Sequence, residues 1–473
     1  MKVVKNMKKF QEKLRDVLDK YRDKTFYVLN NESITYGELL EKSENLSKFL
    51  RSDSSPVIVY GHKNIDMVIS FIGCILANRC YIPVDIFTPL ERIEKIIDLS
   101  KSSLVINVSG RKSSFSIDSI SNIYDLETKC SCENNNDVCY TIFTSGSTGV
   151  PKGVPISYDN LSNFIEWISN IDGFELDRCN VLNQASFSFD LSVTDFYYSL
   201  FNGHTLIGSE KFLQEDLNLF LEYIYKNSVN VCVFTPTFMK YLLLDKGFGE
   251  ENYHAIKVFY FCGEVLDSIL VKKIYDRFPS CKVINAYGPT EATSAISSIV
   301  ITEDMLLLDK LPVGEVDKCN NIIDIIDGEI VIKGKSVFSG YLGNVVGGHF
   351  LENGINCYKT GDLGSIEGNY LYCLGRRDNQ IKLNGYRIEL EEIEKVIKSM
   401  TFVDDCCVCA KKDNIGKVKC LKAFVVGDVS SEDVISFAAS KLPNYMIPKF
   451  VEIVEKLPVN SNGKIDRKKI ENL

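Results

Sequence analysis

Residues 140–153 read YTIFTSGSTGVPKG, an apolar strand pattern followed directly by a loop of glycine and hydroxyl side chains. Glycines let backbone N–H groups approach an anion closely, the hydroxyls can donate further hydrogen bonds, and Lys152 adds a positive charge. The GxxxxGKS/T order of a P-loop is absent. A flexible Ser/Gly linker is the alternative, although a linker would not usually follow a strand so closely. The segment therefore predicts a loop that binds a triphosphate.

Short apolar runs rich in Val, Ile and Phe recur on both sides of this loop and alternate with helical patterns. They are Val57–Tyr60, Leu104–Val108, Val231–Phe234, Val258–Phe261 and Val283–Ala286. Such alternation predicts buried strands in α/β layers. From Gly314 the pattern changes, because Asp327-Gly328 separates two short strand patterns, Ile322–Ile326 and Glu329–Ile332, as in a hairpin.

A second change of pattern lies at Gly375-Arg376-Arg377-Asp378, directly after the strand pattern Tyr370–Leu374. Beyond it follow a Lys/Glu-rich helix (Glu391–Met400), a cysteine-rich strand, the strand pattern Cys420–Val426 and another helix. This succession predicts a small α+β domain at the C-terminal end.

Composition narrows the class of protein. The chain has 473 residues, which predicts two or three packed lobes, and its net charge of −9 argues against bulk binding of nucleic acid. The longest apolar run, Met67–Ala77, is too short to span a bilayer, and the N-terminus has the pattern of an amphipathic helix. We therefore expect a cytoplasmic protein without stable membrane association.

The cysteines are the other unusual feature of the composition. There are sixteen, and in a long chain without a secretory pattern we expect most of them to be reduced and buried. The clusters Cys130-Ser131-Cys132 and Cys406-Cys407-Val408-Cys409 lack the paired CxxC spacing of a zinc site. Cysteine-bound metal is therefore not expected.

The loop at 144–153 resembles the phosphate loop of the adenylate-forming superfamily, which includes acyl-CoA synthetases, luciferases and nonribosomal-peptide adenylation domains. Four further segments resemble that family's motifs in the family's order, and together the five span nearly the whole chain. They are Asn285-Ala286-Tyr287-Gly288-Pro289-Thr290-Glu291, Tyr358-Lys359-Thr360-Gly361-Asp362-Leu363, the segment from Gly375 through Lys382 with Gly385-Tyr386-Arg387, and Asn462-Gly463-Lys464-Ile465-Asp466.

The resemblance implies the architecture and the cofactors. We expect an α/β fold in which residues 1–376 form an adenylation core with two parallel-sheet subdomains and a β-barrel-like one. Residues 377–473 are expected to form a mobile lid domain that turns about Asp378. ATP and Mg²⁺ are the implied cofactors, and Glu291 is the implied ligand of the metal ion, which binds few protein groups. Taken alone, Glu291 would fit a helix start and Asp362 a turn.

The resemblance also assigns roles to single residues. Lys464 is expected to stabilise charge on the α-phosphate and pyrophosphate, and Thr144 and Glu291 complete the catalytic group. The residues expected to bind the nucleotide are Ser145, Gly146, Ser147, Thr148, Gly149, Lys152, Gly263, Glu264, Asn285, Ala286, Tyr287, Gly288, Thr290, Asp362, Arg376, Arg377 and Lys464.

The segment Ser188-Phe189-Asp190-Leu191 resembles that of members that activate amino acids, in which the aspartate pairs with the substrate ammonium. A buried carboxylate needs such a cation, although a helix-capping aspartate is the alternative. Further segments, among them Phe261-Cys262-Gly263-Glu264, resemble D-alanine–carrier protein ligases. The substrate pocket implied is Asp190, Leu191, Thr194, Val233, Cys262, Ala286 and Ser294.

These resemblances imply that D-alanine is activated and passed to the phosphopantetheine of a carrier protein in trans. The hydroxyls of Thr194 and Ser294 depart from the apolar pocket expected and would favour a polar side chain such as serine. A stand-alone adenylation enzyme for another small amino acid is therefore the alternative. An acyl-CoA synthetase is a further alternative that Asp190 disfavours. The presence of four expected site residues argues against a non-catalytic relative that only binds a partner: Lys152, Glu291, Asp362 and Lys464.

Overall fold

The computed structural model describes residues 2–112, 115–124, 126, 137–146, 150–345, 347–412, 418–458, 465 and 467–471. The chain forms two compact units. The first comprises Met1–Ile86, Ser100–Ile142 and Val154–Gly375, and the second comprises Phe87–Leu99, Phe143–Gly153 and Arg376–Leu473.

The largest sheet of the first unit has eight strands. Its inner strands are parallel and only the two outermost pairings, β13 with β14 and β1 with β2, are antiparallel. Their order across the sheet is β14 (Ser297–Val300), β13 (Lys282–Tyr287), β12 (Val258–Phe261), β11 (Val231–Phe234), β9 (Asn180–Asn183), β10 (Thr205–Gly208), β1 (Thr25–Leu29) and β2 (Glu32–Thr35).

In a second sheet, the central strand pairs are parallel. In a third sheet, the strand pairs are antiparallel. The second has the order β6 (Asp118–Ile120), β5 (Leu104–Asn107), β3 (Val57–Gly61), β4 (Tyr81–Asp85), β7 (Val138–Thr144) and β8 (Lys152–Ser157). The third comprises β15 (Gly314–Glu315), β20 (Tyr370–Arg376), β19 (Ile355–Glu367), β17 (Glu329–Lys333) and β16 (Ile322–Ile326), with β18 (His349–Glu352) on β19.

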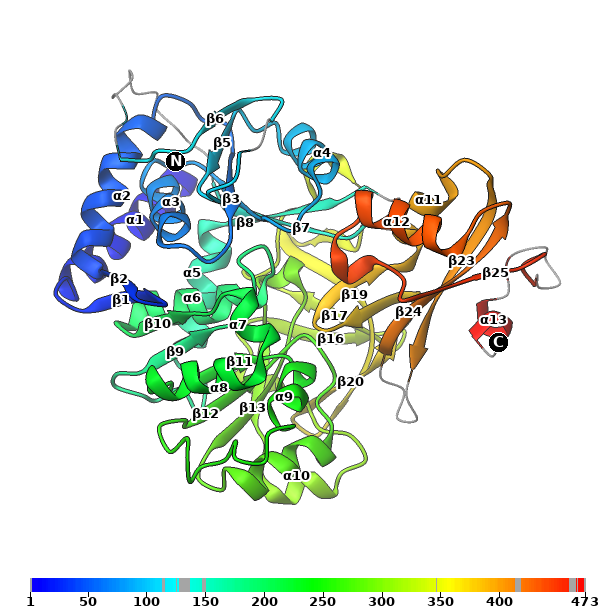
Figure 1. The fold of residues 1–473 in the computed structure, drawn as a ribbon. Coiled ribbons are helices and arrows are strands. Elements are labelled where there is room, and N and C mark those ends of the chain that lie inside the picture. Colours follow the sequence, from blue (N-terminus) through cyan, green and yellow to red (C-terminus); the bar gives the residue numbers. More distant parts are fainter. Residues whose placement is uncertain are drawn as a thin grey trace. The chain divides into compact units, whose positions relative to one another are not determined.

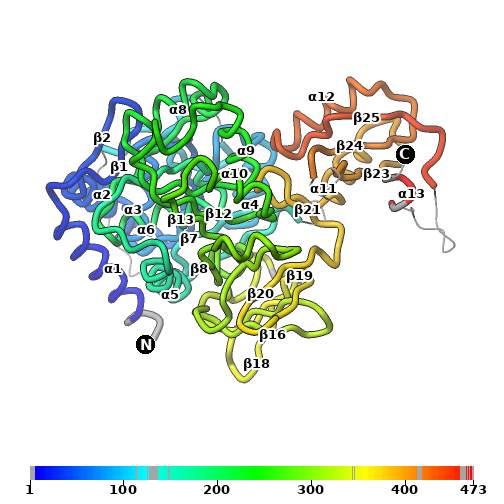
Figure 2. The backbone as a smooth tube through the Cα atoms, turned by 90° about the horizontal axis from the view of Figure 1, so that it is seen from below, coloured from blue at the N-terminus to red at the C-terminus, as the bar shows by residue number. Residues whose placement is uncertain are grey.

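Helices cover the parallel sheets of the first unit (Figure 1). The N-terminal helix buries Met7, Phe10, Leu14 and Leu18, the apolar stripe predicted from its spacing, and packs against three others, α2, α5 and α6 (Figure 2). The α-helices are α1 (Lys2–Lys20), α2 (Tyr36–Leu50), α3 (Ile65–Leu76), α5 (Tyr158–Ile168), α6 (Leu191–Asn202), α7 (Lys211–Glu215), α8 (Leu217–Lys226), α9 (Pro236–Leu242) and α10 (Ser268–Arg277), and short 3-10 turns are η1 (Thr290–Ala292), η2 (Glu303–Leu307), η3 (Val316–Lys318) and η4 (Leu342–Asn344).

The run Met67–Ala77 forms most of α3 and is buried throughout. Within the described parts of the chain, we find no helix with the length and apolarity needed to cross a bilayer.

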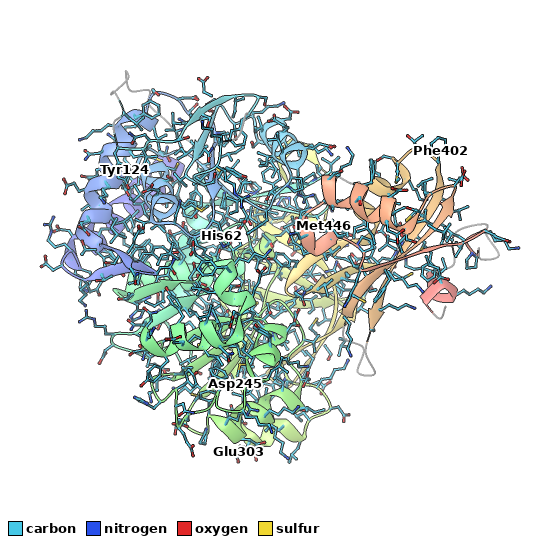
Figure 3. All side chains as sticks on the ribbon, viewed as in Figure 1. His62, Tyr124, Asp245, Glu303, Phe402 and Met446 are labelled. Atoms are coloured by element: carbon cyan, nitrogen blue, oxygen red, sulfur yellow. The ribbon has the colours of Figure 1, made fainter. Side chains whose placement is uncertain are left out.

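The second unit contains α4 (Leu90–Ser100), the loop after β7 and the C-terminal α+β region. Its core lies where α11, α12 and η5 pack on the sheet β23-β24-β25, and it includes the fully buried Met446 that Figure 3 labels. The C-terminal elements are β21 (Gln380–Leu383), β22 (Tyr386–Glu389), α11 (Leu390–Lys398), β23 (Val403–Lys412), β24 (Val418–Gly427), α12 (Ser431–Lys441), η5 (Asn444–Met446), β25 (Phe450–Ile453) and α13 (Arg467–Glu471).

The fold class predicted from the sequence is confirmed. Strands Val231–Phe234 and Val258–Phe261 have the predicted bounds, and the hairpin at Asp327-Gly328 is present as β16 and β17. Most of the described cysteines are buried, as expected. Cys130 and Cys132 lie outside the described residues.

Candidate active site

Three of the residues predicted to form the substrate pocket belong to, or directly follow, three adjacent parallel strands, β11, β12 and β13, toward their carboxyl ends. The three strands are labelled in Figure 1. Ligands of open α/β sheets bind at this edge, because loops and side chains converge there. Val233, Cys262 and Ala286 belong to one buried cluster on the same side of the sheet, together with Leu191 from α6. Three of the residues that sequence reasoning assigned to the pocket, Val233, Cys262 and Ala286, therefore lie on one face at neighbouring strands of this sheet.

Asp190 lies at the residue before α6, in the helical region of the backbone (φ −65°, ψ −21°), and its side chain makes no capping hydrogen bond. The alternative of a helix-capping aspartate is therefore wrong. The hydroxyl of Thr290 donates to Asp190 Oδ2 at 2.5 Å. The carboxylate is thus held at the pocket by a residue of the Asn285–Glu291 motif rather than by its own helix.

A buried lysine anchors the loop that leads to Asp190. The ammonium of Lys63 donates to the carbonyl oxygen of Asn183 at 2.9 Å and to its side-chain oxygen at 2.5 Å, and it also bonds to the carbonyl of Ala185. Asn183 in turn donates to Asp195 Oδ1 at 3.0 Å. Burial lowers the pKa of Lys63 and raises the pKa of Asp195, while their mutual attraction opposes both shifts. The network fixes the path of the chain toward Asp190.

Two hydroxyls of the predicted pocket set contact each other directly. Thr194 Oγ1 and Ser294 Oγ lie 3.2 Å apart, and both residues are buried. The backbone around Ser294 is unusual, because Thr293 and Ser294 have φ values of 62° and 71°. Non-glycine residues in this region store strain, which is typical of functional sites. The backbone after Ser294 packs closely against Gly288, because a Cβ at Gly288 would lie only 2.5 Å from the Cα of Ala295.

Glu291 is fully buried in the turn η1. The hydroxyl of Tyr341 donates to its Oε1 at 2.6 Å, and Tyr341 lies 3.2 Å from the hydroxyl of Tyr358. A carboxylate kept out of water needs such donors or a cation. Burial distinguishes Glu291 from an ordinary glutamate at a helix start, which is solvated.

The predicted motifs 285–291 and 358–363 meet through a tyrosine and an aspartate. The hydroxyl of Tyr287 donates to Asp362 Oδ2 at 2.7 Å, and both side chains are buried. Burial raises the pKa of Tyr287 well above its ordinary value, and the nearby charge of Asp362 raises it further. Asp362 lies inside strand β19, so the interpretation as a turn residue is wrong.

Two residues of the nucleotide set also make structural hydrogen bonds. The side-chain amide of Asn285 donates to the carbonyl of Pro312 at 2.8 Å. Glu264 Oε2 accepts the backbone N–H of Thr237 at 3.0 Å, at the start of α9. Gly263 has a φ of 91°, a conformation that glycine adopts without strain.

The phosphate loop, in the second unit, is described up to Gly146 and again from Val150. A Cβ at Gly146 would lie 2.0 Å from the carbonyl oxygen of Val150. Position 146 therefore has room for glycine but not for a residue with a side chain. Ser145 Oγ donates to the carbonyl of Arg387 at 2.7 Å and accepts the N–H of Glu389 at 3.2 Å. Thr144, expected to take part in catalysis, ends β7 directly before them.

Two carboxylates of the C-terminal region contact this loop, one through a hydrogen bond and one through a long ion pair. The N–H of Gly146 donates to Glu392 Oε2 at 2.9 Å, and Glu392 forms a buried ion pair of 2.5 Å with Arg92. Lys152 Nζ lies 3.9 Å from Glu389 Oε1. Burial raises the pKa of Glu389, and the charge of Lys152 opposes this shift.

The predicted hinge residue is part of a tight local network. Asp378 Oδ1 and Oδ2 accept from Arg376 Nε at 2.9 Å and Arg376 Nη2 at 2.6 Å, and Oδ1 also accepts the N–H of Gln380 at 3.2 Å. Although burial opposes it, Arg376 holds the pKa of Asp378 below its ordinary value. Arg377 is exposed beside this turn.

Four expected site residues lie outside the described residues: Ser147, Thr148, Gly149 and Lys464. Conversely, sequence reasoning missed Tyr341, Lys63, Arg92 and Glu392. A single Tyr, Lys, Arg or Glu in an ordinary segment has no local signal, and only its tertiary contacts reveal it.

Comparison with known proteins decides the family. A model described as "AMP-binding enzyme" matches residues 14–342, and one described as "AMP-binding enzyme C-terminal domain" matches residues 392–464. The chain belongs to the AMP-binding enzyme family.

Two relatives in the same family are named D-alanine–D-alanyl carrier protein ligase. The protein of Bacillus licheniformis is 39% identical over 511 residues, covering 100% of this chain and 99% of its own length. That of Staphylococcus epidermidis is 39% identical over 457 residues, covering 93% and 94%.

Solved structures of AMP-binding enzymes share the fold. The Vibrio cholerae adenylation domain AlmE, in complex with glycyl-adenosine-5'-phosphate, has a TM-score of 0.83 and 21% identity, covering 98% of this chain and 97% of that one. The o-succinylbenzoate CoA synthetase of Bacillus subtilis has a TM-score of 0.82 and 20% identity, covering 98% of both chains.

Proposed function

We propose that this protein activates D-alanine with ATP to form D-alanyl-adenylate and then transfers the alanyl group to the phosphopantetheine thiol of a carrier protein. The observation that carries the proposal is the 39% identity to D-alanine–D-alanyl carrier protein ligase over the full chain. The half-buried Asp190 and the buried Glu291 and Asp362 supply the polar groups that this chemistry needs at the proposed site.

In the first step, a carboxylate oxygen of alanine attacks the α-phosphorus of ATP. A new P–O bond forms, the bond to the β-phosphate oxygen breaks, and pyrophosphate leaves with both electrons of that bond. Asp190 holds the substrate ammonium, Asp362 accepts from the ribose hydroxyls, and Tyr287 packs against the adenine. Lys464 stabilises the negative charge that shifts toward pyrophosphate.

We propose Glu291 as the protein ligand of Mg²⁺. The fit is chemical: magnesium on a nucleotide takes one or two carboxylates and fills its other positions with water and phosphate oxygens. Among the described residues there is no group of three or more metal-ligating side chains, and a site of this kind does not require one. The ion would neutralise triphosphate charge, while Tyr341 orients the Glu291 carboxylate.

In the second step, the carrier thiol gives up its proton to solvent and its sulfur attacks the alanyl carbonyl. A C–S bond forms, the bond from the carbonyl carbon to the AMP phosphate oxygen breaks, and AMP leaves with both electrons of that bond. We propose residues 1–376 as the core and 377–473 as a domain that moves between the two steps. In the structure Gly146 N–H and Lys152 face Glu392 and Glu389. A triphosphate bound to the same donors would be repelled by these two negatively charged carboxylates. Its binding therefore requires the contacts of the loop with Glu392 and Glu389 to break.

The hinge proposal predicts a variant with unequal effects on the two steps. Asp378→Pro fixes φ near roughly −65° and removes the carboxylate that Arg376 binds, so the backbone can no longer switch conformation. We expect adenylation to persist and transfer to the thiol to slow. Single-turnover assays of each step measure this, and normal rates in both would place the hinge elsewhere.

The pocket favours a small apolar side chain over serine. The hydroxyls of Thr194 and Ser294 already have each other as hydrogen-bond partners at 3.2 Å, and both are buried. A substrate hydroxyl would have to replace that bond and would gain little. We therefore propose alanine rather than a polar amino acid.

Cys262 is proposed to select the D enantiomer. It lies at the end of β12, 4% exposed, in the cluster that contains Val233 and Ala286. With the ammonium and carboxylate fixed, the sulfur can obstruct the methyl group of L-alanine only. A buried structural cysteine is the alternative.

We expect Cys262→Ala to raise kcat/KM for L-alanine by about 10- to 200-fold, which is the range of discrimination that one methyl group gives in a pocket. The kcat/KM for D-alanine should change little. Pyrophosphate exchange with each enantiomer measures this. Cys281→Ala, another buried strand-end cysteine outside the pocket, is the control. An equal change for both enantiomers would assign Cys262 to packing alone.

ATP–pyrophosphate exchange across a panel of amino acids and carboxylic acids tests the proposed function. We expect D-alanine to give the highest kcat/KM. Preference for another small amino acid would indicate a different adenylation enzyme, preference for an acid without an amino group would indicate an acyl-CoA synthetase, and no exchange would indicate a partner-binding relative. Transfer to a phosphopantetheinylated carrier protein tests the second step. We propose the cytoplasm, where ATP is available, as the location.

A further inference from the structure

The β9–α6 loop, residues 184–190, ends in a turn that leads directly into Asp190. The N–H of Phe189 donates to the carbonyl of Ser186 at 2.9 Å, and the N–H of Ser188 donates to Ser186 Oγ at 3.4 Å. The carbonyls of Phe189 and Asp190 then accept N–H groups from the first turn of α6. The position of the Asp190 backbone therefore depends on where Ser186 is held.

Ser186 is held by a carboxylate from the other parallel sheet. Its hydroxyl donates to Asp85 Oδ2 at 2.5 Å, and His62 Nδ1 lies 2.8 Å from the same oxygen. Asp85 ends β4, and His62, which Figure 3 labels, directly follows β3. The two strands are parallel neighbours, with Gly61 paired to Asp85. One carboxylate thus links the ends of both strands to the turn before α6.

The surroundings of Asp85 make this a firm anchor. The side chains of His62 and Asp85 are only 13% and 11% exposed. Hydrogen bonds to an ionised group are roughly twice as strong as those between neutral groups, and a buried carboxylate that loses a donor is left poorly satisfied. We therefore expect Asp85 to keep Ser186 in place within a loop that has no regular secondary structure.

The Asp190 carboxylate depends on this anchor for its location. Its side chain makes no capping hydrogen bond with α6, and the hydroxyl of Thr290 donates to its Oδ2. Thr290 orients the carboxylate, whereas the turn places the backbone that carries it. Lys63 anchors the start of the same loop, and Asp85 anchors the turn itself.

We propose that Asp85 is a positioning residue for Asp190: through Ser186 it fixes the turn that sets where the Asp190 carboxylate meets the ammonium group of the substrate. This inference rests on the proposed function, in which Asp190 binds that ammonium. It assigns a role to Asp85, His62 and Ser186, which lie outside the predicted substrate pocket.

A comparison of two substrates tests the proposal. Ser186→Ala removes the hydroxyl that Asp85 holds. A misplaced group in an active site can cost up to roughly 10²-fold, so kcat/KM for D-alanine in pyrophosphate exchange should fall by about 10- to 100-fold, mainly through KM for D-alanine. KM for ATP and kcat/KM for propionate, which has no ammonium, should stay unchanged. Ser186→Thr, which keeps the hydroxyl, should recover most of the loss.

The matched control is Ser55→Ala. The Ser55 hydroxyl also donates to an aspartate, Asp53 Oδ2, at 2.6 Å, and both residues belong to the first unit but not to the β9–α6 loop. This variant should keep the ratio of kcat/KM for D-alanine to kcat/KM for propionate.

Double variants separate positioning from general packing. When Asp190→Asn is already present, Ser186→Ala should cause little further loss with D-alanine, because the charge that Ser186 helps to place is gone. Asp85→Asn should give a smaller loss with the same dependence on substrate, since an amide accepts more weakly than a carboxylate. Should Ser186→Ala fail to fold, Asp85→Asn carries the substrate comparison.

A second measurement does not depend on turnover. An unreactive D-alanyl-adenylate analogue, with a sulfamate in place of the phosphate, carries the ammonium that AMP lacks. Calorimetry should show that Ser186→Ala weakens binding of the analogue by about 10- to 100-fold and leaves the binding of AMP unchanged.

The outcomes separate the two proposals. An unmodified protein that activates no amino acid would overturn the proposed function and the positioning role with it. If another amino acid is preferred, D-alanine is wrong as the substrate, and the same ratios with that amino acid and its deaminated acid test the role of Asp85. In an active protein, equal losses with and without the ammonium, additive effects with Asp190→Asn, or full activity of Ser186→Ala and Asp85→Asn would overturn the positioning role alone.

Discussion

Lys464→Ala should lower the rate of adenylation by roughly 10²- to 10³-fold, the scale for removing one preorganised charge stabiliser. The ammonium is expected to act only while charge moves from the α-phosphorus to pyrophosphate. Transfer of the alanyl group from supplied alanyl-adenylate to the carrier thiol should therefore proceed at the rate of the unmodified protein. Pyrophosphate exchange and a single-turnover thiol-transfer assay measure the two steps separately.

The matched control for this variant is Lys469→Ala, which removes a lysine from the same terminal segment. It should retain both activities. Equal losses in both half-reactions for Lys464→Ala would mean that the residue supports the fold of the C-terminal region rather than the chemistry of the first step.

Asp190→Asn should abolish most of the preference for an amino acid over the corresponding acid. Loss of one member of a buried charge pair costs roughly 2–5 kcal/mol, so kcat/KM for D-alanine should fall by about 30- to 5,000-fold. The asparagine retains the shape and can still accept from Thr290, which donates to Asp190 Oδ2 at 2.5 Å. KM for ATP should not change.

Propionate, which lacks the ammonium, supplies the discriminating comparison. The unmodified protein should use propionate poorly, and Asp190→Asn should leave that activity unchanged or improve it. The ratio of kcat/KM for D-alanine to kcat/KM for propionate should therefore fall sharply. Asp172→Asn, a change at an exposed aspartate paired with Lys318, is the control. If both substrates lose activity by the same factor in Asp190→Asn, the residue organises the pocket and does not bind the ammonium.

The candidate site could be proposed from the sequence because its groups belong to continuous segments. Thr144–Gly153 follows a buried strand, and glycine at 146 is required by a backbone approach of 2.0 Å. Strands β11 and β12 were predicted with their observed bounds, since runs of four apolar, branched or aromatic residues have a strong local preference. Local pattern and order along the chain are enough to place such segments.

The sequence alone therefore determined the α/β layers, the antiparallel region after them, the C-terminal α+β region and the identity of most candidate groups. Only the tertiary structure decided how those groups are held. Thr290 meets Asp190, and Tyr341 meets Glu291, across separations of 100 and 50 residues. Arg467 likewise reaches Val408 over 59 residues. No local preference encodes such contacts, because they arise when separate strands and helices pack, and packing depends on the whole chain.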